Sequence, residues 1–340
     1  MEIEKKVYYY NEMVINPPTV TTRQQLARIR HRHLTCFLEI ARTGKVGLAA
    51  QAMNISQPAA SKTLRELEEI LDTTLFERGG KGGLQMTPAG RVFQRYAGAS
   101  IAALREGLDG LARSRMAGEL VLKIGALPEV AARIMPKVIR SFGQDNPVRL
   151  RVITAPNAAM LHQLRLGELS LVVGRLARPN QMQGLSFTHL YSEKLVCAVR
   201  ADHPLIDRDS FDVATLQHMT ILIPSKDGVV RPAVDRFLVA NGLGALPRSI
   251  EARSTGFCRQ FILDTDAIWI ISRGVVEHDL QNGILGALNI DTSDTQGAVG
   301  LTVRADSDPS PTLRMMMDTI IRVAHEQTLT YPEYFSHPGD

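Results

Sequence analysis

Hydrogen-bonding side chains recur within one short stretch of the chain, Ser56–Arg65. Gln57, Ser61, Lys62 and Arg65 share it with small Pro, Ala and Ser residues. Gln can pair with adenine through two hydrogen bonds, whereas Lys and Arg pair with guanine or phosphate. Short Ala and Ser side chains let a helix enter the major groove of DNA deeply. The stretch therefore predicts a helix that reads base edges.

This stretch also carries the signals of a helix start. Ser56 is suited to act as the N-cap, and Pro58 fits the first turn, where its missing N–H costs nothing. Apolar residues then recur at the spacing of one helical face. Ordinary packed helices with a solvated polar face explain such spacing equally well, so the flanking residues must decide. The apolar face consists of Ala60, Leu64, Leu67 and Leu71.

The flanking residues favour a helix-turn-helix followed by a wing. Upstream, residues 34–41 predict an amphipathic helix that Gly44 closes as its C-cap, and residues 46–53 predict a second, short helix. Downstream, Arg78 and Lys81 lie in or beside a Gly-rich loop. A flexible basic loop of this kind is typical of a wing that lies against the DNA backbone or the minor groove.

A long helix is predicted after the wing. Thr87 is a good N-cap and Pro88 a good first helical residue, and the helix runs to about Met116. Its apolar stripe is narrow and its glycines weaken helix propensity, so pairing with a second copy of the chain would bury and stabilise it. We therefore predict a dimerising linker helix at residues 87–117. The stripe consists of Phe93, Ala97, Ser100, Leu104, Leu108 and Leu111.

Five short signatures follow one another along these predicted elements. They are Ala49-Ala50, Ser56-Gln57-Pro58-Ala59-Ala60-Ser61, Leu67-Glu68, Leu75-Phe76-Glu77-Arg78 and Thr87-Pro88-Ala89-Gly90. In this order and spacing they closely resemble the N-terminal domain of LysR-type transcriptional regulators. The resemblance implies a winged helix-turn-helix at residues 33–90 that binds double-stranded promoter DNA. The chain departs from the family at two positions, with Lys45 in place of Ser and Asp72 in place of Gly.

The predicted DNA contacts come from the helix-turn-helix and the wing. Lys45 lacks the side-chain oxygen of a helix cap, but its charge suits a phosphate. The full set is Lys45, Ser56, Gln57, Pro58, Ala59, Ser61, Lys62, Arg65, Arg78 and Lys81.

Length and charge agree with this interpretation. The 340 residues predict two or three domains, and the net charge is +4. Residues 1–118 hold 17 Lys and Arg against 11 Asp and Glu, whereas the remainder holds 22 against 24. A basic module joined to a slightly acidic one fits DNA binding on one side and a different role on the other. A chance imbalance of surface charge is the alternative.

The sequence also indicates where the protein works. It has neither a signal peptide nor a stretch of about 20 apolar residues, so we expect a cytoplasmic protein with no membrane contact. Its three cysteines are scattered, which fits a reducing compartment and excludes a metal spacing. Residues 1–32 lack periodicity and are predicted to be a mostly disordered extension. Alternatively, translation starts at Met13 rather than Met1.

Strands and helices alternate from about residue 118, which predicts an α/β architecture with a parallel sheet. Two crossings between two lobes would leave a cleft for a ligand. The LysR-type resemblance extends over this half more loosely and implies the two-lobed effector-binding domain of the family, a fold shared with periplasmic solute-binding proteins. We predict this domain at residues 118–335, with lobe I at 118–199 and 297–335 and lobe II at 200–296.

Effector contacts are expected where strands end and helices begin, because backbone amides there favour anions. Family members often place hydroxyls in the loop after the first strand, but this chain has Ala126 and Leu127. Arginines and hydroxyls elsewhere suit an anionic ligand, although a cap or a surface ion pair explains each one alone. Trp269 is expected in the core. The predicted effector contacts are Leu127, Pro128, Thr154, Asn157, Ser225, Arg231, Ser254, Thr255 and Arg273.

No catalytic set is visible, because no nucleophile elbow, metal spacing or phosphate-binding fingerprint occurs. We therefore predict a non-enzymatic, sequence-specific transcription factor without metal or cofactor, assembled as a dimer of dimers and acting on RNA polymerase. Within the family it looks most like regulators of protocatechuate catabolism and of sugar-binding-protein genes, so an organic acid of aromatic catabolism is the expected effector. A two-lobed solute-binding protein and a sugar-responsive regulator are the alternatives.

Overall fold

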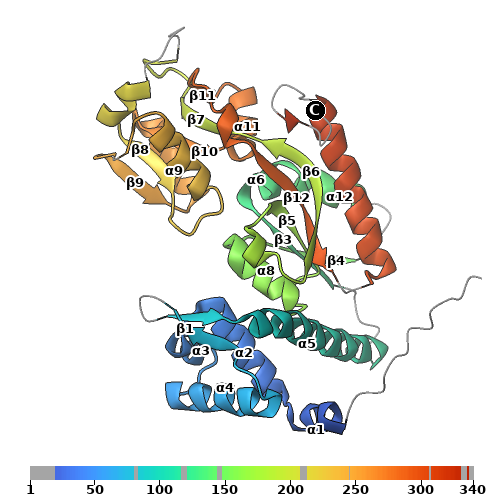
Figure 1. Ribbon diagram of the computed structural model, residues 1–340. Coiled ribbons are helices and arrows are strands. Elements are labelled where there is room, and N and C mark those ends of the chain that lie inside the picture. Colours follow the sequence, from blue (N-terminus) through green and yellow to red (C-terminus); the bar gives the residue numbers. More distant parts are fainter. Residues whose placement is uncertain are drawn as a thin grey trace, which may run out of the picture. The chain divides into compact units, whose positions relative to one another are not determined.

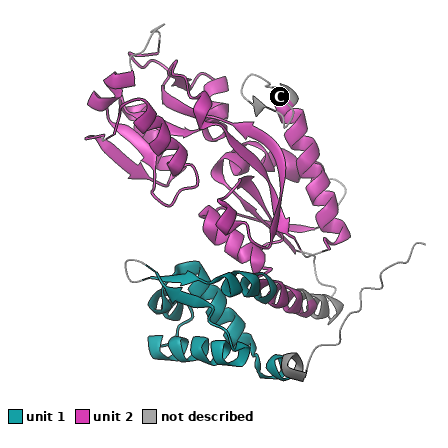
Figure 2. Ribbon diagram, in the orientation of Figure 1, with its two compact units in different colours: residues 1–97 teal, residues 98–340 magenta. Residues whose placement is uncertain are grey.

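The computed structural model describes residues 20–79, 83–115, 121–143, 148–206, 213–244, 246–305, 308–330 and 335–336 (Figure 1). The chain divides into two compact units, Met1–Ala97 and Gly98–Asp340 (Figure 2). In the described part of both units, no helix is long and apolar enough to cross a lipid bilayer.

The first unit is a small bundle of helices with a two-stranded wing. Strands β1 and β2 pair antiparallel, with Phe76 opposite Met86. The long helix α5 starts in this unit and continues into the second. The elements are α1 (Val20–Arg28), α2 (His31–Thr43), α3 (Val46–Ala52), α4 (Gln57–Leu71), β1 (Phe76–Arg78), β2 (Leu84–Met86) and α5 (Pro88–Arg115).

An aromatic cluster holds the core of this unit together. The fully buried Phe37 ring of α2 lies 5.3 Å from the Phe76 ring of β1 and 5.1 Å from the Phe93 ring of α5. Edge-to-face and tilted contacts at these centroid distances are favourable beyond simple burial. Cys36 is buried beside Phe37, which confirms that it is a small core residue.

Contacts between side chains and backbone connect three of the sequence signatures: Leu67-Glu68, Leu75-Phe76-Glu77-Arg78 and Thr87-Pro88-Ala89-Gly90. The Glu68 carboxylate accepts hydrogen bonds from the backbone N–H groups of Leu75 and Phe76, so α4 fixes the start of the wing. At the next signature, the Thr87 hydroxyl accepts from the Gly90 amide at 3.0 Å. A Cβ atom on Gly90 would stand 2.3 Å from the carbonyl oxygen of Leu75, so only glycine fits.

Two sequence predictions for this unit are corrected. Residues 20–28 form helix α1 rather than a disordered extension, because the segment holds good helix formers and neither Gly nor Pro. Residues 1–19 lie outside the described residues. On α4, Ile70 rather than Leu71 completes the buried face, because a spacing of three keeps it in line with Leu67 as the helix ends.

The second unit contains two sheets. Lobe I has six strands in the order β13-β6-β12-β5-β3-β4, and lobe II has five in the order β11-β7-β10-β8-β9. The lobe I elements are β3 (Val121–Ala126), α6 (Pro128–Arg133), α7 (Met135–Gly143), β4 (Arg149–Ile153), α8 (Asn157–Arg165), β5 (Leu171–Arg175), η2 (Pro179–Gln181), β6 (Leu185–Glu193), β12 (Gly297–Arg304), α12 (Pro311–Thr330) and β13 (Phe335–Ser336). The lobe II elements are β7 (Leu195–Arg200), η3 (Val213–His218), β8 (Ile221–Pro224), α9 (Arg231–Ala240), β9 (Ser249–Ala252), α10 (Thr255–Asp264), β10 (Ile268–Ser272), α11 (Arg273–Gln281), β11 (Leu285–Ala287) and η4 (Ser293–Thr295).

The sheets are mixed rather than parallel throughout. Strands β3, β4 and β5 run parallel, whereas β12 pairs antiparallel with β5 and β6. In lobe II, β8 runs parallel to β9 and β10, and β7 pairs antiparallel with β10. The antiparallel strands arise because the chain enters and leaves each lobe through extended crossings rather than through helices.

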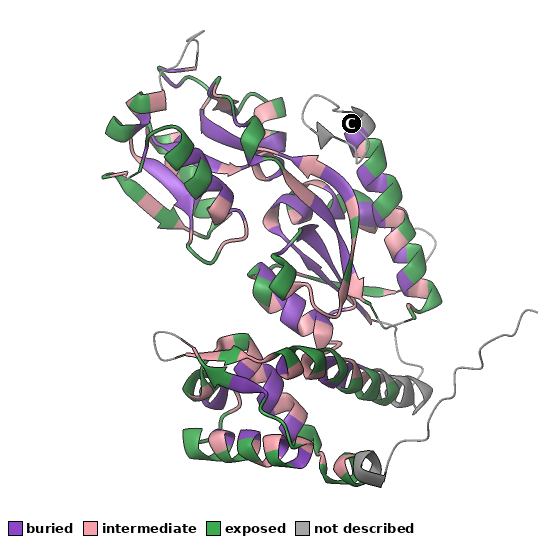
Figure 3. Cartoon of the chain, in the orientation of Figure 1, coloured by how far each residue is buried: buried purple, intermediate pink, exposed green. Residues whose placement is uncertain are grey.

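The first crossing between the lobes lies at Lys194, earlier than predicted. Strand β7 was expected in lobe I, but it pairs with β10 and β11 and belongs to lobe II. Only Lys194 separates β6 from β7, so no turn or loop in the sequence marks the break. The predicted return at residue 297 coincides with the start of β12. Figure 3 shows that the central strands of both sheets are the buried elements of this unit.

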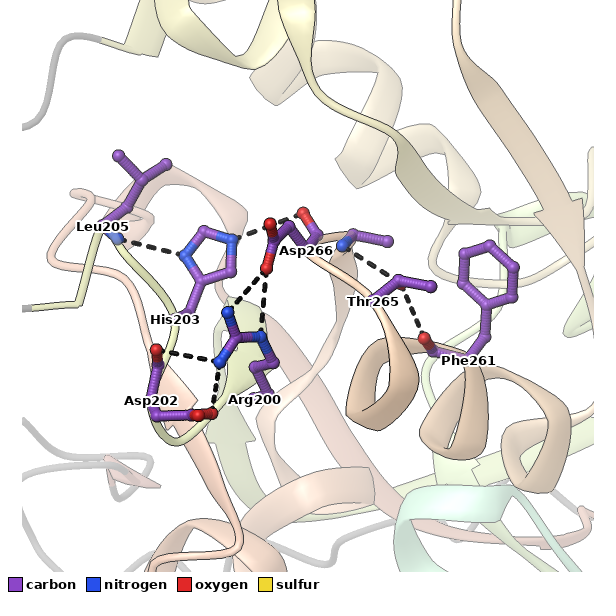
Figure 4. A network of polar contacts seen from close by, with 8 residues as sticks. Arg200, Asp202, His203, Leu205, Phe261, Thr265 and Asp266 are labelled. Atoms are coloured by element: carbon purple, nitrogen blue, oxygen red, sulfur yellow. Dashed lines mark hydrogen bonds and ion pairs between the residues drawn. The ribbon is translucent and has the colours of Figure 1, made fainter.

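A polar network fixes the loop after β7 to the turn before β10 (Figure 4). Arg200 binds Asp266 at 2.7 Å and also pairs with Asp202. The buried His203 accepts at Nδ1 from the Leu205 amide, so its Nε2 carries the proton and donates to the carbonyl oxygen of Asp266 at 3.3 Å. These contacts hold the loop after β7 against the turn before β10 in lobe II.

Candidate functional site

The predicted base-reading helix begins as its residues indicate. Ser56 is the extended N-cap of α4, and its Oγ accepts a hydrogen bond from the Ala59 amide at 3.3 Å. Pro58 occupies the first turn. Because this cap is satisfied locally, the exposed side chains that follow on the helix are free to make other contacts.

The polar side chains of α4 point away from the core of the first unit. Gln57, Lys62 and Arg65 are exposed, and Ser61 is half-buried. Lys62 also lies 3.9 Å from Glu66, which Arg32 contacts at 3.1 Å. Burial opposes ionisation of Glu66, but hydrogen bonds and charge from its basic neighbours outweigh it and lower the pKa of its carboxyl. Pro58 and Ala59 are exposed at the same end of the helix.

Three of the predicted DNA contacts line one hollow in the surface of this unit. Lys45 lies before α3, Gln57 at the start of α4, and Arg78 at the end of β1, and all three line a cavity of about 630 Å³. A Cβ atom on Gly47 would stand 3.2 Å from Gln57 Oε1, so glycine leaves room for the Gln57 side chain. The hollow brings the helix-turn-helix and the wing onto one surface.

The wing is tied to the helices at its base. The Leu84 amide donates to the Gly44 carbonyl oxygen at 2.8 Å, and Gly44 is the left-handed C-cap of α2 that the sequence predicted. The Gly79 amide donates to Gly83 across the wing at 2.8 Å. Lys81 lies outside the described residues.

A second cavity, of about 300 Å³, lies between the two lobes of the second unit. Six of the nine predicted effector contacts line it, from the ends of β3, β4 and β8 and from the starts of α6, α8 and α10. They are Leu127, Pro128, Thr154, Asn157, Ser225 and Thr255.

The other three predicted contacts lie outside the lining of this cavity. Arg231 pairs with Asp235 and Glu251 and donates to the Pro224 carbonyl oxygen. Arg273 forms an ion pair with Glu277 at 2.8 Å. Ser254 is the N-cap of α10, and its Oγ accepts from the Phe257 amide.

Several lining residues were missed by the sequence analysis. The cavity is mostly apolar, with Trp269, Ile271 and Val275 among its walls. Trp269 was expected in the core, and it is indeed buried, but it also faces this cavity. The signal for it was available, because it lies in a strand that ends at the predicted ligand edge of the sheet.

Charge in the cavity comes from few groups. Arg253 is the one lysine or arginine in its described lining, and it holds Asp227 through two contacts at 2.7 and 2.8 Å. Asn157 at the start of α8, Thr255 at the start of α10 and Ser272, the N-cap of α11, all line the cavity, so the N-terminal amides and dipoles of these helices contribute positive potential there. Glu129 is a second carboxyl in the lining and is buried.

A neighbouring cavity of about 470 Å³ shares the loop at residues 226–229 with the first. It is lined by Arg178, Lys226 and Arg236, together with the buried Arg175. Of the predicted effector contacts, only Asn157 lines it.

Comparison with known protein families identifies both units. The family model described as "Bacterial regulatory helix-turn-helix protein, lysR family" matches residues 31–91. The model described as "LysR substrate binding domain" matches residues 118–324.

The chain belongs to the LysR family of transcriptional regulators.

Named relatives agree with this assignment. This LysR-type regulator is 46% identical over 300 residues to the HTH-type transcriptional regulator PcaQ of Agrobacterium fabrum, a match that covers 88% of this chain and 96% of that protein. It is 32% identical over 294 residues to a protein of Escherichia coli described as "Uncharacterized HTH-type transcriptional regulator YdcI", covering 86% of this chain and 95% of that protein. These relatives are named as regulators and not as enzymes, and the match gives no support to a solute-binding protein.

Solved structures share the fold of this LysR-type regulator. Full-length BenM aligns with a TM-score of 0.51 at 22% identity, covering 91% of this chain and 100% of that one. A Corynebacterium glutamicum OxyR C206 mutant aligns with a TM-score of 0.51 at 20% identity, covering 89% and 95%. The winged helix-turn-helix and the two-lobed α/β domain predicted from the sequence are therefore confirmed. As a member of its family, the regulator binds DNA and responds to a small-molecule effector.

Proposed function

We propose that the effector of this LysR-type regulator is a small organic acid, bound in the cavity between the lobes. The observation that carries the proposal is the convergence of three helix N-termini on a mostly apolar cavity. Amides at helix starts favour a carboxylate, and walls such as Trp269 favour a flat hydrocarbon body. The Thr154 hydroxyl supplies a hydrogen bond at the end of β4, and the Ser225 hydroxyl, which donates to Asp227 at 2.9 Å, lies at the end of β8.

The relatedness to PcaQ supports an acid of aromatic catabolism as the effector. The sequence signatures resembled regulators of protocatechuate catabolism, and the 46% identity to PcaQ over nearly its whole length supports the same subgroup. A neutral sugar is the competing ligand, since regulators of sugar-binding-protein genes were the other resemblance. The exposed surface of the cavity is mostly apolar, which disfavours a sugar, because a sugar needs many hydrogen bonds.

DNA recognition in this proposal uses the surface built by α3, α4 and the wing. Gln57 and Ser61 read base edges, whereas Lys45, Lys62, Arg65 and the wing hold phosphates. The N-terminal part of α4, Ser56 to Ala59, comes closest to the bases. A cytoplasmic dimer of dimers then contacts several half-sites about 34–36 Å apart, or a multiple of that, and bends the promoter. The effector favours one of two assemblies and so changes the access of RNA polymerase.

Helix α5 supports the assembly part of this proposal. Four of its large apolar side chains are exposed, which is unusual for a helix that works alone. Pairing with a second copy buries them as a coiled-coil-like seam. The four are Val92, Tyr96, Leu104 and Leu108.

The test is a thermal-shift screen of the full-length protein against carboxymuconates and, in parallel, against neutral sugars. At about 100 times Kd the ligand should stabilise the protein by about 2.7 kcal/mol. Thr154→Val and Ser225→Ala should each reduce the shift, and Arg236→Ala, in the neighbouring cavity, should not. A shift with sugars alone would exclude an acidic effector. A shift lost in Arg236→Ala but kept in Thr154→Val would place the effector in the neighbouring cavity.

A further inference from the structure

Glu129 is the buried carboxyl of the interlobe cavity. It lies in the first turn of α6, is 4% exposed and lines the cavity. Its Oε1 atom has no hydrogen-bond partner among the described residues. Helix α11 passes close by, since a Cβ atom on Gly274 would stand 3.3 Å from Glu129 Cβ. Glu129 therefore lines the cavity with a carboxyl oxygen that has no hydrogen-bond partner among the described residues.

Among the described residues, the salt bridges of the arginines around Glu129 are made to other carboxylates. Arg175 is committed to Glu193, donating to its carbonyl oxygen at 3.2 Å and lying 3.6 Å from its carboxylate. Arg273 pairs with Glu277 across one turn of α11. In the described lining, Arg253 is held by Asp227. Arg175, Arg273 and Arg253 thus each already have a carboxylate partner, and Arg133 on α6 lies over the Tyr191 ring, 4.6 Å from its centroid.

The surroundings of Glu129 disfavour its charged form. Burial removes the water that would solvate a carboxylate, and the fully buried Glu193 adds a second negative charge nearby. Burial first, and Glu193 second, raise the pKa of Glu129 to about 7, against a smaller opposing effect of Arg175. The charged and titratable groups around it are Arg133 on its own helix, Arg175 on β5, Tyr191 and Glu193 on β6, and Arg273 and Glu277 on α11.

We propose that Glu129 contacts the effector as a neutral carboxylic acid and donates a hydrogen bond to a carboxylate of the ligand. The effector and one proton then bind together. This inference rests on the organic acid proposed above as the ligand class, and it adds the residue that selects for it. An ionised Glu129 would repel the ligand, whereas the protonated group adds a hydrogen-bond donor beside the hydroxyls and helix N-termini of the cavity.

An amine ligand is the opposite possibility, since it would pair with an ionised Glu129. The three helix N-termini at the cavity oppose this, because their potential is positive and disfavours a cation. An acid ligand satisfies both the helix starts and Glu129, and an amine satisfies only the carboxyl. The geometry therefore favours the acid.

The experiment measures affinity for 3-carboxy-cis,cis-muconate with the full-length protein at pH 6 and pH 8. Trp269, the single tryptophan of the chain, lines the same cavity and provides the fluorescence signal. No histidine is among the described lining residues, so Glu129 is the group in the cavity whose pKa lies in this range. Affinity of the wild type should fall about tenfold from pH 6 to pH 8, as the protonated fraction falls.

Two variants separate Glu129 from the other cavity carboxyl. Glu129→Gln keeps a hydrogen-bond donor but cannot ionise, so its affinity should change less than about twofold over the same range. Asp227→Asn is the matched control and should keep the tenfold dependence. Calorimetry of the wild type at pH 8, in two buffers of different ionisation enthalpy, should show uptake of nearly one proton per ligand, which needs no variant.

The outcomes are distinct. A wild-type affinity that is equal at both pH values, or calorimetry without proton uptake, overturns the role of Glu129 and leaves the organic acid as effector. A tenfold dependence retained in Glu129→Gln overturns it as well. If the wild type binds the acid at neither pH but an amine analogue at pH 8, the ligand class proposed above fails, and this inference fails with it.

Discussion

Glu68 and Leu75 are joined by a hydrogen bond of 2.7 Å, from the Leu75 amide to the Glu68 carboxylate, and the Phe76 amide reaches the same oxygen at 3.2 Å. The contact fixes the first strand of the wing to the helix that is proposed to read bases. The contact joins two of the sequence signatures, Leu67-Glu68 and Leu75-Phe76-Glu77-Arg78, and gives a physical reason for the residues in both.

Removing this contact should loosen the wing. Glu68→Ala leaves two backbone amides without their acceptor, at a cost of about 1–3 kcal/mol, whereas Glu68→Gln keeps an acceptor oxygen and should cost less. Hydrogen exchange followed by mass spectrometry should show faster exchange over residues 74–78 in Glu68→Ala. Unchanged exchange there would mean that the pairing of β1 with β2 holds the wing without Glu68.

Gln57 should contribute to sequence recognition rather than to general affinity. Gln57→Ala removes a side chain that can pair with adenine, so binding to the specific promoter duplex should weaken by about 1–3 kcal/mol. Titrations against specific and scrambled duplexes at several salt concentrations provide the measurement. Equal losses on both duplexes would argue against base reading by Gln57.

Arg78 provides the contrasting case on the wing. Arg78→Ala should weaken binding to both duplexes similarly and reduce the salt slope by about 1, because it removes a phosphate contact. A loss confined to the specific duplex would instead indicate that Arg78 enters a groove and reads its bases.

The exposed leucines of α5 should govern assembly. Leu104 and Leu108 are 54% and 58% exposed within one chain, so Leu104→Glu or Leu108→Glu should barely affect the folding of the isolated chain. In a paired seam the same change buries a charge at a cost of several kcal/mol. Sedimentation should show smaller assemblies, and DNA affinity should fall because half-sites are no longer bound together. Full oligomer mass in both variants would place the interface elsewhere.

Arg253 should raise the affinity for the effector by neutralising Asp227. Arg253→Ala leaves the Asp227 carboxylate with the Ser225 hydroxyl but without its arginine, so its negative charge in the cavity wall is no longer offset. Affinity for an acid should then fall by about tenfold, a typical value for a charged hydrogen bond. Adding Asp227→Asn should restore much of that loss. Fluorescence titration of Trp269 measures all three proteins, and a double variant no better than Arg253→Ala would show a direct contact between Arg253 and the ligand.

The sequence determined the elements whose signals are local. The cap at Ser56, the close at Gly44 and the start of α5 at Thr87 depend on residues within four positions of each other, and the structure has each one. Local periodicity also indicated that strands and helices alternate after residue 118. The same local rules placed six of the nine predicted effector contacts at the cavity, because strand ends and helix starts gather there.

Tertiary structure decided what depends on partners distant in the chain. Arg231 and Arg273 carry the right charge for an anion, but Glu251 and Glu277 already hold them, and no local pattern reveals such pairing. The passage from lobe I to lobe II at Lys194 is set by which strands β7 pairs with. In the sequence, nothing distinguishes Glu129 from any acidic residue in the first turn of a helix. The packing of α11 against Glu129 and the nearby Glu193 carboxyl give it a buried position at a ligand cavity. Burial and nearby charge are properties of the folded chain, so the sequence alone does not reveal them.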